Sequence, residues 1–163
     1  MPAAAASRAS CSTCSRPTTP PLPSPTRLAR DEDPANNPAH YVRYAHARTA
    51  SIEREAGEER TQEALRWSPG GPLELHPSER ELVRKLLAFP GEVGEATARR
   101  APHRIATYAL ELARTYSAFY RDCPVLKAET SDLQSFRLGL CVATRRTIAR
   151  ALDLLGVSAP ESM

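Results

Sequence analysis

The segment NPAHYVRYAHAR, residues 37–48, predicts how the rest of the chain folds. Asn37 is a good N-cap for a helix, and Pro38 suits the first helical position because its fixed φ is already helical. Apolar and small residues then recur every three or four positions, which indicates one buried stripe along a helix. The stripe comprises Val42, Ala45, Thr49, Ile52 and Ala56. This segment therefore predicts an amphipathic helix that opens a helical region.

Proline and glycine mark the limits of that region. The sequence SPGGP at residues 68–72 should break the first helix, which we expect to run to about Arg60, or as far as Leu65. The proline-rich tract within residues 1–35 cannot hold helix or sheet hydrogen bonds, and we expect it to be a disordered tail. Residues 36–163 are then predicted to form one domain.

A second helix is expected to begin at Ser78, where Ser78 and Glu81 have the S-x-x-E spacing of a capping box. The Phe89-Pro90 pair is expected to end it, with a short, weaker helix following at residues 92–100. Its predicted apolar face consists of Leu82, Val83, Leu86 and Leu87.

The third helix should open at Pro102 and stop at Pro124. Its stripe consists of Ile105, Ala109, Leu112, Tyr116 and Phe119. A last helix is expected from Ser131 to Leu155, with Gly156 as its C-terminal cap. Its inward positions are Leu133, Phe136, Leu140, Ala143, Ile148, Ala151 and Leu155. No segment alternates with period two, so we predict an all-α fold, a bundle of four to five helices.

Composition excludes some functions and leaves others open. The 22 Lys and Arg residues nearly balance the 19 Asp and Glu residues, and the net charge of +3 alone does not indicate a nucleic-acid binder. Almost all the cations are arginine, which fits either RNA contact or a GC-rich genome. No run of 18 apolar residues occurs, so no membrane span is expected. The basic, acid-free start of the chain resembles a transit peptide in composition, but its prolines oppose the helix that such a peptide needs.

Chemical motifs are scarce. Cys11 and Cys14 form one C-x-x-C pair, but the second pair that a zinc site needs is missing, so we predict no metal. No disulfide framework is visible, which fits a reducing cytoplasm. Phosphate-cradling glycine loops and the common hydrolase motifs are absent. The four histidines are not spaced as metal ligands, and no catalytic residue is predicted; they are His40, His46, His76 and His103.

Aromatic and arginine side chains gather on the first helix. Tyr41, Tyr44 and Arg48 are spaced i, i+3 and i+7, so they share one face. Unpaired RNA bases stack on aromatic rings or guanidinium planes, while cations meet the phosphates. The spacing alone favours the other interpretation, in which the tyrosines lie at the edge of a core and bind no ligand.

Four blocks resemble one family, the arginyl-tRNA synthetases, in the same order and with similar spacing. They are NPAHYVRYAHAR at 37–48, LVRKLLAFP at 82–90, PHRIATY at 102–108 and ALDLLGVSAPESM at 151–163. The last block ends at a terminal Met, as the family's chains do. The resemblance implies the C-terminal anticodon-binding domain of that family, a helical bundle of the DALR type, with the anticodon arm of tRNA-Arg as its partner.

The resemblance also implies site residues. The family positions beside the anticodon loop fall on Tyr41, Tyr44, Tyr120 and Met163. Rings offer a flat face to a base, and a flexible thioether can close over one. We add Arg48 from the shared helix face and Arg145 as a phosphate contact, together with its neighbour Arg146, although a solvated helix face explains these two arginines as well.

The family makes arginyl-adenylate from ATP and arginine and then charges the tRNA. Its His-x-Gly-His block and Lys-Met-Ser-Lys-like loop do not occur in these 163 residues. We therefore expect this chain alone to be inactive as a ligase and to bind no cofactor, ATP being used by the full-length family. We expect a cytoplasmic monomer. The alternatives are a stand-alone tRNA-binding module that acts in trans, or an inert product of a truncated or frameshifted reading frame.

Overall fold

The structure, a computed structural model, describes residues 37–162. This part consists of five α-helices and contains no strand. The helices are α2 (Pro38–Ala56), α3 (Glu58–Arg66), α4 (Pro77–Ala98), α5 (His103–Asp122) and α6 (Ser131–Leu154). The prediction of an all-helical bundle is confirmed for these residues. The predicted disordered tail, residues 1–35, lies outside them.

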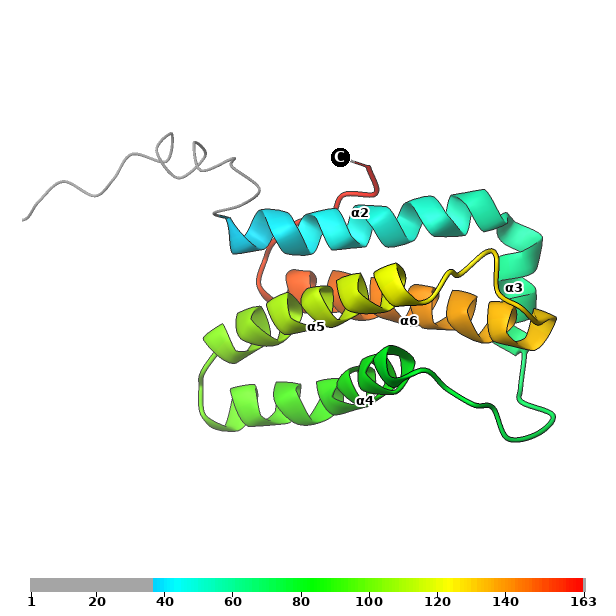
Figure 1. Cartoon of the computed structure of the whole chain (residues 1–163). Coiled ribbons are helices and arrows are strands. Elements are labelled where there is room, and N and C mark those ends of the chain that lie inside the picture. Colours follow the sequence, from blue (N-terminus) through cyan, green and yellow to red (C-terminus); the bar gives the residue numbers. More distant parts are fainter. Residues whose placement is uncertain (1–36, 163) are drawn as a thin grey trace, which may run out of the picture. The chain divides into compact units, whose positions relative to one another are not determined.

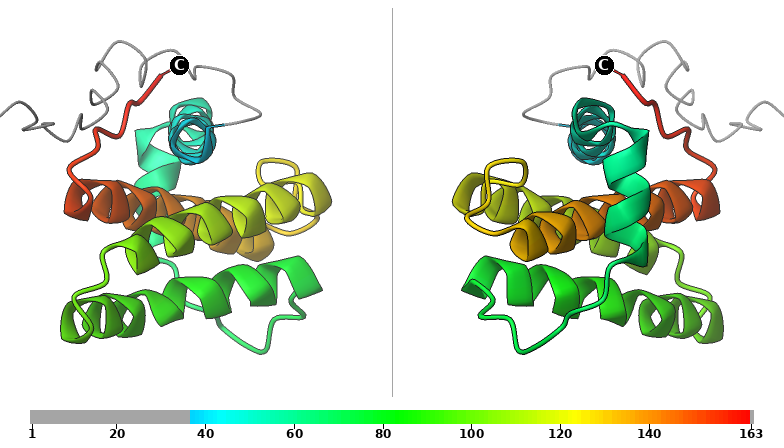
Figure 2. Two further views of the ribbon diagram at one scale, coloured as in Figure 1. Left: turned by 90° about the vertical axis from the view of Figure 1, so that its left-hand side faces the viewer. Right: turned by 90° about the vertical axis from the view of Figure 1, so that its right-hand side faces the viewer.

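The helices form three layers (Figures 1 and 2). Helices α5 and α6 make the central layer, α2 covers one side of it, α4 covers the other, and α3 packs on α6 at one end. The predicted stripes of α2 and α5 are confirmed, since every member is buried. The largest side chains with no exposed surface come from three of the helices: Leu82, Leu112, Tyr116, Phe119 and Ile148.

The predicted start of α2 is confirmed. The Asn37 side-chain oxygen accepts hydrogen bonds from the backbone N–H groups of Ala39 (3.0 Å) and His40 (3.4 Å). These bonds satisfy two of the donors that the first turn of a helix leaves free, and Pro38 follows at the first helical position. Local sequence therefore fixes where this helix begins.

The predicted end of the first helix is wrong, because the chain breaks at Gly57. Gly57 has φ +85°, a left-handed conformation that glycine adopts at little cost. Its N–H donates to the Glu53 carbonyl (3.1 Å), which closes α2. Its carbonyl accepts from the N–H (3.1 Å) and the hydroxyl (2.8 Å) of Thr61, which opens α3. One residue thus ends one helix and begins the next.

The predicted cap of α4 is also wrong by two residues. His76, not Ser78, is the N-cap: its Nδ1 accepts from the Ser78 N–H (3.3 Å), and the Glu79 carboxylate accepts from the His76 N–H (2.7 Å). Pro77 takes the first helical position, where a missing N–H costs nothing. Glu79 is fully buried and accepts from Arg137 Nε of α6 at 2.6 Å. This tertiary ion pair selects Glu79 over Glu81.

Pro90 does not end α4, contrary to prediction. The helix continues to Ala98 and absorbs the short helix expected at residues 92–100. An interior proline costs about 3 kcal/mol, because it removes a backbone bond. Packing on both sides of the proline offsets that cost: the Phe89 ring lies 5.3 Å from Tyr108 of α5, and Ala96 is buried.

Two further predictions concern single residues. Leu87, expected to face the core, is 75% exposed. It stands five positions after buried Leu82, about 140° round the helix, and α4 is covered on one side only. Gly156 caps α6 as predicted: it has φ +69°, its N–H donates to Asp153 O (3.0 Å), and the Val157 N–H donates to Leu152 O (2.9 Å).

Candidate functional site

Three predicted site residues meet on the outer side of the α2–α5 contact. Tyr44 and Arg48 are one turn apart on α2, so they share a face, and α5 packs on α2 and brings Tyr120 to them. The guanidinium carbon of Arg48 lies 4.4 Å from the centre of the Tyr120 ring and 5.4 Å from that of Tyr44. We call these three residues the ring cluster. Its geometry is that of a cation–π contact on two rings.

A hollow of about 320 Å³ lies beside the ring cluster. We call it the ring hollow. Its other lining residues are Ala47, Ser51, Ile52, Arg54, Glu55 and Ser162. Tyr44 is 48% exposed and Tyr120 is 38% exposed, so both present ring surface to solvent. A single exposed ring is common at a protein surface, but two rings that share one cation beside a hollow form a joint aromatic surface that a ligand can contact.

Two arginines line the ring hollow without an ion pair among the described residues, Arg48 and Arg54. Arg48 has no ion pair among the described residues and is held by the two rings alone. Arg54 donates to the Ser51 hydroxyl (3.0 Å), and Glu55 contributes a carboxylate to the wall. The hollow therefore offers two flat faces and a guanidinium plane to a ligand.

The core supports Tyr120 from behind. The centre of the fully buried Tyr116 ring lies 6.3 Å from that of Tyr120. Burial raises the pKa of Tyr116 above its usual range, with a further increase from neighbouring Cys141. Burial also raises the pKa of the Cys141 thiol to about 12. Both groups are therefore neutral at physiological pH, and Tyr120 rests on an uncharged, packed base.

Tyr41 lies one turn before Tyr44 but outside the ring hollow. Its hydroxyl donates to the Ser117 hydroxyl (2.9 Å), which in turn donates to the Ala113 carbonyl (2.9 Å). The ring is partly buried against the core. Tyr41 thus joins α2 to α5, and its predicted contact with RNA stays a prediction.

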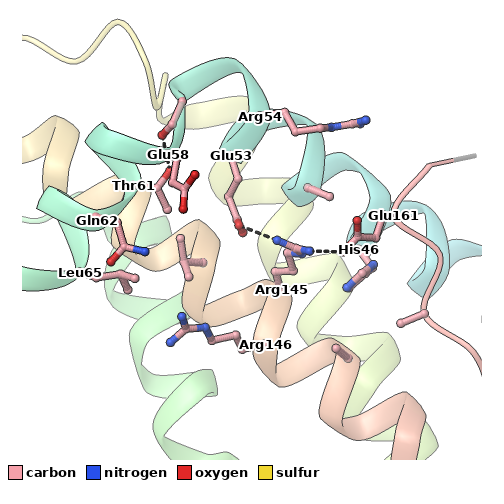
Figure 3. Close-up of a pocket in the computed structure, with 15 residues that line it drawn as sticks. His46, Glu53, Arg54, Glu58, Thr61, Gln62, Leu65, Arg145, Arg146 and Glu161 are labelled. Atoms are coloured by element: carbon pink, nitrogen blue, oxygen red, sulfur yellow. Dashed lines mark hydrogen bonds and ion pairs between the residues drawn. The ribbon is translucent and has the colours of Figure 1, made fainter.

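Arg145 lies in a different hollow, of about 670 Å³, between α2, α3, α6 and the chain after α6 (Figure 3). We call it the ion-pair hollow. Arg145 donates to Glu53 Oε2 (2.6 Å) and to Glu161 Oε1 (2.5 Å). Arg146 lines the same hollow and is exposed. The structure therefore separates Arg145 from the ring cluster, and its predicted phosphate contact stays a prediction.

Sequence analysis missed part of the ring hollow and could not place Met163. Ser51 and Glu55 stand seven positions after Tyr44 and Arg48, so helical spacing could have identified them. No local signal could have identified Ser162, which reaches the hollow from the chain after α6. Met163, the remaining predicted site residue, lies outside the described residues.

No helix within residues 37–162 has both the length and the apolar character needed to cross a membrane. The same residues contain no group of three metal-ligating side chains. Cys11 and Cys14, the pair considered for a metal, lie outside them. The buried Cys123 and Cys141 are free thiols.

Comparison with known proteins identifies relatives of the helical region. A family model described as the DALR anticodon binding domain matches residues 42–163. An arginine–tRNA ligase of Frankia casuarinae is 43% identical over 127 residues, which cover 78% of this chain and 20% of that protein. An arginine–tRNA ligase of Streptomyces coelicolor is 46% identical over 123 residues, 76% of this chain and 20% of that protein. The chain thus spans about a fifth of the length of these curated relatives.

Solved structures resemble the same region. The arginyl-tRNA synthetase of Thermus thermophilus matches with a TM-score of 0.65 and 42% identity over 76% of this chain and 21% of that one. A putative arginyl-tRNA synthetase of Campylobacter jejuni has a TM-score of 0.69 and 24% identity over 78% of this chain and 27% of that one, which supports the fold alone.

Proposed function

The chain belongs to the DALR anticodon-binding domain family, and from this we propose that it binds the anticodon arm of tRNA-Arg as the RNA-binding part of an arginine–tRNA ligase. The unpaired bases of the anticodon loop are the natural ligand for exposed rings, because sequence-specific RNA recognition targets bases that can be turned out of a stack.

The ring cluster is the observation that carries this proposal. Tyr44 and Tyr120 keep about half and over a third of their surface exposed, and Arg48 lies against both rings without a carboxylate partner among the described residues. A base can stack on the free face of Tyr44 or Tyr120, while the guanidinium attracts the adjoining phosphate or extends the stack. Met163 is proposed to contribute a further contact.

The proposal separates binding from chemistry. The matched relatives are ligases, but this chain corresponds to about a fifth of their length. We propose that it supplies recognition of the tRNA, as a cytoplasmic monomer, and that the ATP-dependent charging reaction needs a catalytic part outside these 163 residues. Incubation of the chain with ATP, arginine and tRNA-Arg should then yield no charged tRNA. Charged tRNA formed by the purified chain would contradict this separation.

A competition experiment tests the recognition itself. Fluorescently labelled anticodon stem–loop of tRNA-Arg is titrated with the full chain at low ionic strength, because phosphate contacts weaken as salt rises. We expect saturable binding that unlabelled tRNA-Arg competes away. A stem–loop with the same stem and a substituted anticodon should compete less well. Equal competition by both stem–loops, or no binding, would refute anticodon recognition.

A further inference from the structure

The chain after α6 turns back and runs beside α2 (Figure 2). We call residues 157–162 the strap. The positive φ of Gly156 redirects the backbone as α6 ends, and Val157 and Ala159 pack partly buried against the core. A chain end without such contacts is usually poorly ordered. The course of the strap therefore needs specific contacts to hold it.

Two side chains from different helices hold the strap. The Nδ1 atom of His46, on α2, lies 2.8 Å from the Pro160 carbonyl oxygen. Because a carbonyl oxygen only accepts, the imidazole must carry a proton on Nδ1 to make this bond. Arg145, on α6, donates to the carboxylate of the next strap residue, Glu161 (2.5 Å; Figure 3).

Both holding residues are themselves fixed. His46 is only 3% exposed, so neighbouring side chains confine its ring beside Pro160. Arg145 also donates to Glu53 of α2 at 2.6 Å, and the Glu53 side chain is 12% exposed. The guanidinium thus bridges a helix and the strap, and its planar fork suits two carboxylates at once.

The held residues lead directly to the ring hollow. Pro160 and Glu161 are followed by Ser162, which lines that hollow together with Tyr44, Arg48 and Tyr120. The ion-pair hollow and the ring hollow are therefore connected through the strap. Walls of the ion-pair hollow carry carboxylates that oppose a phosphate, including Glu53, Glu58 and Glu161, which favours an intramolecular role for Arg145.

We propose that His46 and Arg145, acting through Pro160 and Glu161, are positioning residues that hold the end of the chain as a wall of the RNA-binding hollow. The proposal rests on the function proposed above. Arg145 then affects RNA binding without touching RNA, and the strap forms a fixed wall beside a bound nucleotide. Holding the wall in place before binding lowers the entropy that the ligand must otherwise offset.

Glu161→Gln is the main test, because it removes the charge from one strap contact, which turns an ion pair into a weaker neutral hydrogen bond, and leaves the partly buried Arg145–Glu53 pair intact. Charge alone predicts that losing a carboxylate near RNA tightens binding, whereas the strap predicts weaker binding. We expect the dissociation constant for the tRNA-Arg anticodon stem–loop to rise about 3- to 10-fold. Glu63→Gln is the matched control: it removes an exposed carboxylate of α3 that has no ion pair among the described residues, and should not weaken binding.

His46 provides a second, independent variant pair. His46→Phe keeps a ring but loses the donor to Pro160, whereas His46→Asn retains a donor near the position of Nδ1. We expect His46→Phe to weaken RNA binding and His46→Asn to recover most of it. Steady-state ¹⁵N NOE values of the Ser162 amide, measured on the full chain without RNA, should fall in Glu161→Gln and stay high in Glu63→Gln. An effect on this amide is one that altered charge alone would not produce.

The outcomes separate the two proposals. Unchanged or tighter RNA binding by Glu161→Gln, or a Ser162 amide as ordered as in wild type, overturns the strap while leaving RNA binding at the ring cluster intact. Wild-type affinity in Tyr44→Ala and Tyr120→Ala would instead overturn the proposed function. Loss of binding in both sets of variants, with the amide mobile only in the strap variants, supports both proposals.

Discussion

Arg48, on α2, and Arg145, on α6, differ in every partner. Arg48 lies against two tyrosine rings and has no ion pair among the described residues. Arg145 lies between two carboxylates, Glu53 and Glu161. The contrast shows that partners, rather than residue type, decide which cation can serve a ligand. A guanidinium whose charge is already matched by two carboxylates attracts a phosphate only weakly, whereas one that rests on rings keeps its charge and its hydrogen-bond donors for a ligand.

The largest expected effect is a loss of stability from a substitution in the core beneath the two hollows. Leu112 is fully buried on α5 and lines neither hollow. We expect Leu112→Ala to lower the free energy of unfolding by about 2–5 kcal/mol, because the truncation leaves a cavity. RNA affinity measured well below the melting temperature should stay as in wild type.

Urea denaturation measures this loss, and Leu87→Ala provides the control. Leu87 is 75% exposed on α4, so its truncation should change stability by less than about 0.5 kcal/mol. A loss below about 1 kcal/mol for Leu112→Ala would mean that the bundle repacks around the missing side chain.

Arg145→Met gives the next largest effect and tests the ion-pair side of the comparison. It leaves the Glu53 carboxylate, with a side chain only 12% exposed, without its cation. We expect the free energy of unfolding to fall by about 2 kcal/mol, less than for breaking a fully buried pair, because the Arg145 side chain is 28% exposed. Arg150→Met removes an exposed pair with Asp153 and should cost at most about 0.5 kcal/mol.

Thermal unfolding of these variants at pH 7 distinguishes two roles of Arg145. Full stability of Arg145→Met, combined with a loss of RNA affinity and of one phosphate contact in the salt dependence, would restore Arg145 as a direct RNA contact. It would also remove the contrast between the two arginines.

The sequence predicts features that depend on neighbours along the chain. The start of α2 at Asn37 and the shared face of Tyr44 and Arg48 follow from capping and helical spacing. Features that depend on residues far away in the sequence were not predicted. Helix α4 continues through Pro90 because Phe89 packs on Tyr108 of α5, and no window of sequence contains that contact.

The candidate site shows the same limit. Tyr120 is 76 residues from Tyr44 in the sequence and was assigned only through family resemblance. The ion pairs of Arg145 were not predicted because its partners are far away: Glu53 precedes it by 92 residues and Glu161 follows it by 16. Sequence analysis recognises an arginine but cannot recognise that its charge is already matched across the fold.

Tyr44→Ala tests the ring side of the comparison. We expect RNA binding to weaken by about 1–3 kcal/mol, the range for losing one base–aromatic stack. The melting temperature should change little, because the ring is 48% exposed. Tyr41→Phe is the control, since it keeps a ring one turn away and removes only the hydroxyl that bonds Ser117. A large stability loss with unchanged RNA affinity would instead assign Tyr44 to the core.

Arg48→Lys should have the smallest effect on RNA affinity. It tests whether Arg48 stacks on a base or only contacts a phosphate. Lysine keeps the charge but loses the plane that lies 4.4 Å from the Tyr120 ring centre. If Arg48 extends a stack, RNA binding should weaken by about 1 kcal/mol, while the slope of log affinity against log salt stays the same because the phosphate charge is still met. If it only meets a phosphate, lysine should bind RNA as well as arginine does. Weaker RNA binding by Arg48→Lys together with a shallower salt slope would contradict both explanations. It would mean that the lysine ammonium no longer contacts the RNA that the guanidinium contacted.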